Sequence, residues 1–299
     1  MSAEGWALFS ACCFAGSHVV SKRGLQDTSV TAASLIVLGV SWAVIAVAVL
    51  LDPPAEVAPR AIVVYGALGL MVPAISRWAV LKSVDVLGPS IAIPIQQGLR
   101  PLLAVTGAAL LLDEDVGLVR GIGVLLIIAG GWQLSKRPPE DRVGLDVAAG
   151  SRERRWALRP GIVFPVIAAV AYAASDLLVR STLGDDLAEP SFAAMVSTGS
   201  GLLAWLLVVV AIRPMRASIR FGRAAWWLVG SGALIGFAIL GVYQALSRGE
   251  VSLVTPINAT QPLIVLLFSM LLLRDLERIR PITVVSATEI VAGAVLVSL

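Results

Sequence analysis

The chain has 299 residues, of which 58% are hydrophobic and only 14% are charged, and its mean hydropathy is +0.88. A soluble domain carries roughly a quarter charged residues, so this composition excludes a water-exposed globular protein and favours one embedded in lipid. The net charge of +3 does not indicate nucleic-acid binding. The basic residues lie in short loops between apolar spans, which is the pattern of cytoplasmic loops beside anionic lipid.

Ten apolar runs are long enough, or nearly so, to cross about 30 Å of hydrocarbon as α-helices. In chain order they cover residues 5–21, 30–51, 60–81, 87–112, 117–135, 160–179, 191–212, 225–246, 251–273 and 281–299. We therefore predict an all-α polytopic protein of the cell membrane. It has a first half at 1–135, a basic polar linker at 136–159 and a second half at 160–299.

The two halves repeat each other in sequence. The run from Phe14 to Lys22 returns as Tyr172 to Arg180, and the run from Gln97 to Pro101 returns as Asn258 to Pro262. Each half holds an odd number of spans, so the second half must enter the membrane upside down relative to the first. Two inverted five-helix repeats around a shared centre are typical of secondary transporters.

The loops predict the orientation of the chain. Of the 23 Lys and Arg residues, all but six lie in loops that follow odd-numbered spans. The exceptions are Arg60, Arg120, Arg180 and Arg248 in the other loops, and Arg77 and Arg100 within spans. The positive-inside rule therefore places the odd-numbered loops in the cytoplasm and both termini outside.

The eighth span contains Gly232-Ala-Leu-Ile-Gly236. Glycines at this spacing let two helices approach closely. We expect them to pack against another helix of the same chain, with the face of a homodimer as the alternative.

Polar groups within the spans indicate a site, because charges at mid-bilayer are costly unless they are paired or hydrated. His18 and Asp176 occupy equivalent positions in the first and sixth spans, next to Ser17 and Ser175. Each precedes by four residues a base on the same helix face. One interpretation is a substrate or proton site between them. The other is that Asp176 pairs with Arg180 while His18 is a neutral packed ring.

Prolines interrupt the fourth and ninth spans at matching places. Pro101 and Pro262 lack an N–H, so carbonyls near Gln97 and Asn258 lose their helical partners. Pro94 and Pro256 loosen the same helices one to two turns earlier. Interrupted helices at corresponding places in two halves indicate a transport site. The alternative is two kinks with hydrogen bonds between helices.

Three more residues extend the predicted site. Glu289, in the last span, either neutralises Arg100 or carries a proton. Trp78 and Tyr243 occupy matching places and either stack on a substrate or belong to interfacial aromatic belts. Arg77, near the end of the third span, is expected to reach the interface. The predicted substrate-binding residues are Ser17, His18, Trp78, Gln97, Arg100, Ser175, Asp176, Tyr243, Asn258 and Gln261, and the predicted proton carriers are His18, Asp176 and Glu289.

No metal or cofactor is expected. Asp113-Glu114-Asp115 lacks the spaced oxygens and the glycine of a calcium loop. The sequence contains no HExxH, GxSxG, P-loop or GxGxxG string. These observations argue against an enzyme.

Together, these motifs resemble the drug/metabolite transporter superfamily, specifically its EamA-type members. That family shows an aromatic-small-small-polar run ending in a base on its first and sixth helices. Its fourth and ninth helices carry a proline, an apolar run and an acidic residue, and its fifth and tenth end in small-residue-Gly patterns. The corresponding segments here are Phe14–Lys22 and Tyr172–Arg180, Pro101–Glu114 and Pro262–Asp275, and Ala129-Gly130 and Ala292-Gly293.

The resemblance implies ten helices in two repeats and a secondary carrier of small metabolites, often amino acids or related compounds, frequently moved outward. Two features depart from the family pattern. Members commonly have cytoplasmic termini, whereas the charge count here favours termini outside. Arg100 also stands where an uncharged residue usually precedes the proline, which suggests an anionic group on the substrate.

The leading hypothesis is therefore a secondary active transporter working by alternating access, with its site formed by spans one, four, six and nine. Its expected partners are a small-molecule substrate and membrane lipid, and no nucleic acid. Proton-coupled export of an amino acid or organic anion is one form of this hypothesis. The alternatives are a flippase for a lipid-linked metabolite, an intramembrane enzyme using His18 and Asp176, and a sensor that transports nothing.

Overall fold

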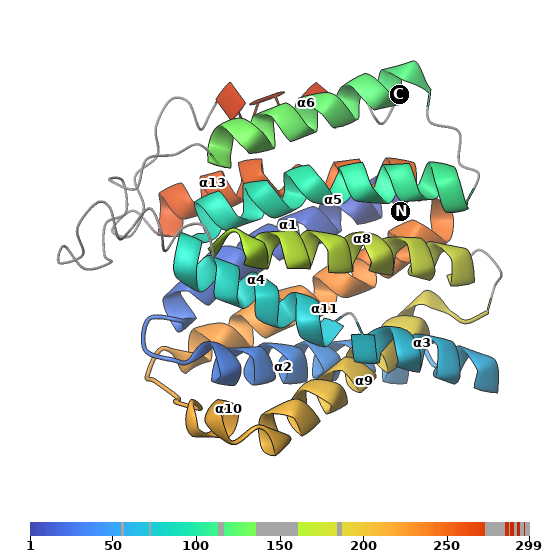
Figure 1. Ribbon diagram of the computed structural model, residues 1–299. Helices are drawn as coiled ribbons and strands as arrows, with labels where there is room; N and C mark the ends of the chain where they lie inside the picture. Colours follow the sequence, from blue (N-terminus) through green and yellow to red (C-terminus); the bar gives the residue numbers. More distant parts are fainter. Residues whose placement is uncertain are drawn as a thin grey trace.

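The computed structural model describes residues 1–54, 57–71, 73–112, 117–135, 161–183 and 187–272, with single positions from 285 to 296. The regular elements in these ranges are helices, stacked roughly side by side along one long axis (Figure 1). They are α1 (Ala3–Gly24), α2 (Val30–Leu51), α3 (Pro59–Met71), α4 (Pro73–Leu87), α5 (Pro89–Leu111), α6 (Leu118–Ser135), α8 (Val163–Leu183), α9 (Pro190–Ala211), α10 (Arg213–Ala217), α11 (Ala225–Arg248), α12 (Val251–Asn258) and α13 (Gln261–Leu272).

The first nine predicted spans are each occupied by helix, which confirms the all-α fold class. The linker at 136–159 and most of the tenth span lie outside the described residues, so the tenth helix stays a prediction. The short helix α10, between α9 and α11, was not predicted.

Local sequence sets where several helices begin. The Ser2 and Ser29 hydroxyls accept hydrogen bonds from the backbone N–H of Gly5 and Ala32, each at 3.3 Å, and so cap α1 and α2. Pro89 and Pro190 open α5 and α9, where a missing N–H costs nothing. Gly88, just before α5, has a φ of 79°, a backbone conformation that favours glycine.

The outer surface of the bundle is apolar. Large side chains such as Leu50, Val63, Leu125, Leu203 and Leu267 are more than half exposed. Five segments of the described chain are long and apolar enough to cross a membrane: Val30–Leu51, Pro59–Leu87, Val163–Leu183, Pro190–Ala211 and Ala225–Arg248. A surface of this kind suits contact with acyl chains rather than with water.

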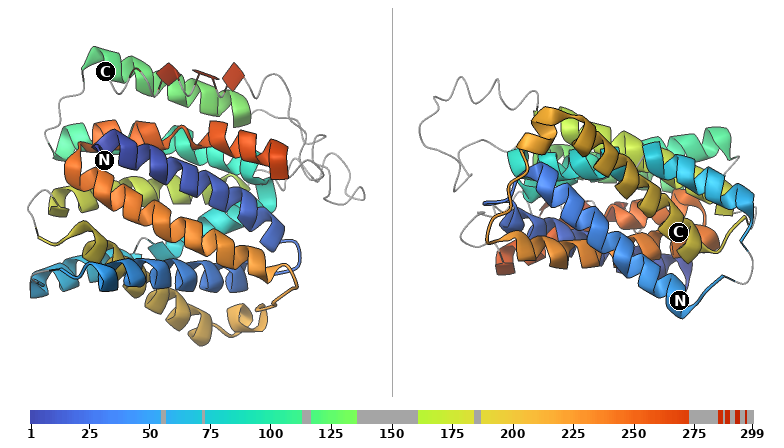
Figure 2. Two further views of the ribbon diagram at one scale, coloured as in Figure 1. Left: turned by 180° about the vertical axis from the view of Figure 1, so that it is seen from behind. Right: turned by 90° about the horizontal axis from the view of Figure 1, so that it is seen from below.

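Equivalent helices of the two halves run in opposite directions. α1 and α11 are antiparallel, because Ser10 bonds the Ala238 carbonyl at 2.9 Å while Ser21 bonds Ser231 at 2.7 Å. The end of α8 meets the end of α11, where Arg180 donates to the Leu246 carbonyl at 3.1 Å. The end of α8 therefore lies beside the start of α1, which is the inverted relation expected from the odd number of spans. From behind, α1 lies between α11 and the α12–α13 pair (Figure 2).

The two glycines of the eighth span pack within the chain, as expected. A Cβ at Gly232 would press on Val40 and the Val37 carbonyl, and one at Gly236 would press on Val44 and the Ser41 carbonyl. All of these atoms belong to α2. The small residues therefore bring α11 and α2 into backbone contact.

The third predicted span holds two described helices, α3 up to Met71 and α4 from Pro73, while residue 72 between them lies outside the described residues. The whole stretch Pro59–Leu87 is long and apolar enough to cross a membrane. α4 lies in the interior of the bundle, where it packs against α8, α5 and α2.

Of the two predicted interruptions, the structure contains one. The ninth span breaks between α12 and α13 at Ala259 and Thr260, since Pro262 offers no N–H to the Asn258 carbonyl. α5, in contrast, continues as one helix through Pro94 and Pro101. An internal proline removes one hydrogen bond and crowds one carbonyl, which bends a helix without necessarily ending it.

Candidate functional site

A cavity of about 60 Å³ lies inside the bundle, between the two halves. Such a volume holds a few water molecules or one small polar group. The first half contributes α1, α2, α4 and α5, and the second contributes α8, α9 and α11. The lining residues are Phe14, Leu38, Ser76, Arg77, Arg100, Tyr172, Ser175, Asp176, Ser197, Thr198, Ile239, Val242 and Tyr243.

An ion pair in the cavity joins the two halves. Arg100 on α5 donates from Nε to Asp176 Oδ2 and from Nη2 to Asp176 Oδ1, each at 2.8 Å. The two side chains are only 3% and 4% exposed. This two-pronged geometry is the strongest that an arginine and a carboxylate can form. Asp176 therefore neutralises Arg100, the role that the sequence left open for Glu289, and it does not pair with Arg180.

Tyr172 of α8 connects two arginines from the other half. Its ring lies 5.1 Å below the Arg100 guanidinium, and its hydroxyl accepts a hydrogen bond of 3.1 Å from Arg77 Nη2. The same ring meets Phe14 edge-on at 6.4 Å. Phe14 and Tyr172 are equivalent in the sequence repeat, so the matching helices α1 and α8 meet at the centre of the molecule.

Arg77 differs from the expectation. It was predicted to reach the membrane interface, but it is 4% exposed and lines the cavity. The reason is the packing of α4, which contacts α8, α5 and α2 inside the bundle. Arg77 therefore faces the cavity and the Tyr172 hydroxyl rather than the head groups.

The far wall of the cavity is polar and aromatic. Tyr243 on α11 and Ser197 on α9 share a hydrogen bond of 2.8 Å, and Thr198 follows Ser197 along the same wall. Ser197, Thr198 and Ser76 were not selected from the sequence. The sequence did contain a signal that could have identified them, because each is a polar residue within an apolar span.

Of the predicted substrate-binding residues, the cavity brings together Arg100, Ser175, Asp176 and Tyr243. Ser17 is buried and donates to the Phe14 carbonyl at 2.8 Å. Trp78 packs instead against Phe164 and Trp205, with ring centroids 5.4 and 6.4 Å away.

His18 is buried on α1, stacked on Phe14 and next to the Gln261 amide. Glu289 accepts a hydrogen bond of 2.8 Å from Gln133 on α6. Neither residue lines the cavity.

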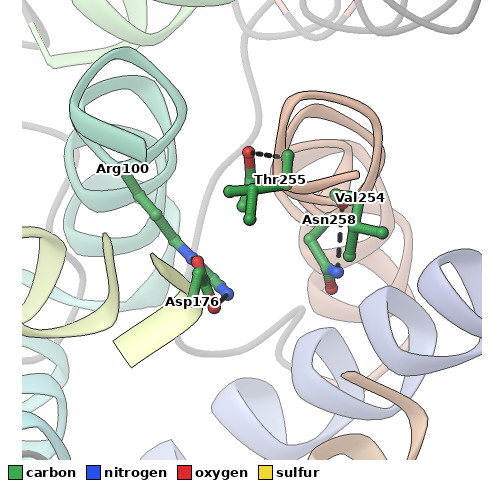
Figure 3. A network of polar contacts seen from close by, with 6 residues as sticks. Arg100, Asp176, Val254, Thr255 and Asn258 are labelled. Carbon is green, nitrogen blue, oxygen red and sulfur yellow. Dashed lines mark hydrogen bonds and ion pairs between the residues drawn. The ribbon is translucent and has the colours of Figure 1, made fainter. Parts of the chain in front are cut away.

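The remaining predicted residues form a second polar region beside the cavity. Gln97 on α5, Asn258 on α12 and Gln261 on α13 are at most 1% exposed, and each has a side-chain oxygen without a hydrogen-bond partner. In Figure 3, Asn258 on α12 lies across from the Arg100–Asp176 pair. Asn258 also donates to the Val254 carbonyl at 3.3 Å, one turn back along α12.

An inverted helical bundle with an apolar surface and a charged cavity between its halves is the architecture of membrane carriers of small molecules. The model of the EamA-like transporter family matches residues 1–135 and 159–299, so the chain belongs to that family and is a multi-pass integral membrane protein. A crystal structure with 18% sequence identity superposes with a TM-score of 0.68, covering 97% of this chain and 98% of the other, which shows the same fold. None of the curated proteins matches the chain.

Proposed function

We propose that this transporter is a secondary active carrier that moves a small metabolite, such as an amino acid or an organic anion, by alternating access. The observation that carries the proposal is the buried Arg100–Asp176 pair, which spans the interface between the two halves inside their shared cavity. Any rocking of one half against the other must act on this pair. A group in the cavity that competes for either partner is then coupled to the movement.

Two matched contacts, one within each half, tie helix ends together at opposite ends of the bundle and support gating by helix movements inside each half. Lys22, at the end of α1, donates to the Val84 and Asp85 carbonyls of α4 at 3.3 and 3.2 Å. Arg180, its repeat equivalent at the end of α8, donates to the Leu246 carbonyl of α11. Since α1 and α8 run in opposite directions, the two contacts lie at opposite ends of the bundle. Both are formed in this structure.

A proton gradient is suited to drive such a carrier through the protonation and deprotonation of Asp176. Protonation of this carboxyl would remove its charge and weaken its hold on Arg100, which loosens the contact between the two halves. Coupling of substrate movement to a proton gradient follows from this step. His18 and Glu289 remain further candidates for the proton path, at a distance from the cavity lining.

Transport in proteoliposomes tests the proposal. We expect the reconstituted protein to accelerate the flux of at least one labelled amino acid or organic anion over empty vesicles, and an imposed pH gradient to drive its accumulation. Asp176→Asn is expected to abolish the response to the gradient. Equal fluxes in loaded and empty vesicles across a broad panel would contradict it, and flux of a fluorescent lipid instead would favour the flippase.

The two gates give a separate prediction. Lys22→Met and Arg180→Met are expected to open the cavity toward opposite sides of the membrane, because each removes the contact that closes one end. A Thr198→Cys reporter, with Cys12 and Cys13 replaced by Ser, is labelled with an impermeant maleimide from either side. Arg248→Met is the control, since among the described residues Arg248 donates to Gln244 of its own helix. Identical labelling of both variants from one side would rule out matched gates.

A further inference from the structure

We propose that Arg77 holds the anionic group of the transported metabolite, a carboxylate on a compact aliphatic body. This inference rests on the proposed function and assigns the substrate's charge to a residue that the sequence did not place in the site. It also gives the two arginines of the cavity different roles. Arg100 forms an ion pair with Asp176, whereas Arg77 has no carboxylate partner among the described residues.

The charges of the cavity do not balance. Its lining contains two guanidinium groups, Arg77 and Arg100, and one carboxylate, Asp176. Both oxygens of Asp176 are taken by Arg100. The other ion pair in the described part of the chain joins Lys82 and Asp85, away from the cavity. Arg77 therefore has no carboxylate partner among the described residues.

An uncompensated charge at this depth needs an external counter-charge. Arg77 is 4% exposed, and its side-chain hydrogen bond goes to a neutral phenol, the Tyr172 hydroxyl. A guanidinium buried without an anion is costly, whether in protein or in the membrane. Since Arg77 lines the cavity, a bound anion can reach it. The remaining N–H groups form a fork that matches the two oxygens of a carboxylate.

The rest of the lining limits the shape of that anion. Leu38, Ile239 and Val242 present aliphatic surface to the same space, and Tyr243 and Ser197 add hydroxyl groups already bonded to each other. The cavity volume of about 60 Å³ leaves no room for a large ring system in this structure. A short branched carboxylate places its charge at Arg77 and its body against the aliphatic wall.

The test compares carboxylates with their uncharged isosteres. The purified wild-type protein, in neutral detergent, is titrated at millimolar concentrations with a series from acetate to 4-methylpentanoate and with the corresponding amides, and ligand-induced thermal shifts are recorded. We expect stabilisation by at least one carboxylate and not by its amide. Amides that stabilise the protein as well as the carboxylates do would overturn the assignment. A series in which no carboxylate binds would overturn it too. Both outcomes are read from the wild-type protein alone.

Variants of Arg77 then test whether this side chain binds the carboxylate. Arg77→Gln is expected to lower carboxylate affinity at least about 30-fold, and Arg77→Lys less, because it keeps the charge but loses the fork. Arg60→Gln removes an exposed charge from the same half and is the matched control. If Arg77→Gln still prefers carboxylates over amides as strongly as the wild type, the proposal is overturned. It is also overturned if phosphatidylglycerol in nanodiscs, and not the carboxylates, stabilises the protein in an Arg77-dependent way.

The two proposals fail separately. Binding of carboxylates through Arg77 without any flux in proteoliposomes would contradict the transport function and leave this site intact. Flux of neutral or cationic metabolites, unaffected by carboxylates, would contradict the site and leave the transport function intact.

Discussion

Asp176→Asn is expected to destabilise the folded protein by about 3–5 kcal/mol, the range found when one partner of a buried ion pair is removed. The change leaves Arg100 without its carboxylate, at 3% side-chain exposure, beside an Arg77 that already lacks one. Two uncompensated guanidinium groups would then share one small cavity. We expect transport to fall to the level of empty vesicles in the same variant.

Thermal unfolding in detergent measures the effect, with a double variant to separate stability from function. Arg100→Met with Asp176→Leu removes both charges, and an apolar pair of similar volume is often as stable as the ion pair it replaces. We expect the double variant to recover most of the stability and none of the transport. Asp85→Asn is the control, because its pair with Lys82 is 36% exposed on both sides and contributes about 1 kcal/mol or less. A melting temperature of Asp176→Asn equal to that of Asp85→Asn would refute the argument.

Gly69→Ala is expected to destabilise the protein by about 3 kcal/mol, the upper part of the range for overpacking a tight contact. A Cβ at this position of α3 would overlap the Ser197 carbonyl and the Ser200 hydroxyl of α9. The carbonyl belongs to the backbone of a long helix and cannot rotate away. Relief of the clash must push α3 from α9, and it would carry Ser197 away from Tyr243.

Gly66, one turn earlier on the same helix, is the matched control. A Cβ there meets nothing within 4 Å, so Gly66→Ala is expected to stabilise α3 by about 0.5–1 kcal/mol through lower chain entropy. The two variants thus change the melting temperature in opposite directions although the chemical change is the same. A similar shift in both would show that α3 and α9 are not packed as described.

The helices that hold the site were largely predictable, because span positions depend on local hydropathy alone. The first nine spans were placed close to their observed limits, and the odd number of spans in each half required the inverted arrangement that the helix directions show. One exception comes from proline. α5 passes through Pro94 and Pro101 where a break was expected.

The site itself was only partly predictable. Arg100, Ser175, Asp176 and Tyr243 were selected because polar groups within apolar spans are costly, and the cavity contains them. The sequence did not predict which of these residues form an ion pair. The sequence suggested Arg180, four residues away on the same helix, as the partner of Asp176, whereas the observed partner Arg100 is 76 residues away.

By itself, the sequence determined that this protein is a helical membrane carrier made of two inverted halves, since hydropathy, span number and repeat spacing are properties of the chain alone. The tertiary structure decided which charges meet, because contacts between distant helices depend on their rotation and crossing. The rotation of α5 and α8 brought Arg100 to Asp176, and the packing of α4 inside the bundle placed Arg77 in the cavity with no carboxylate beside it in the described residues.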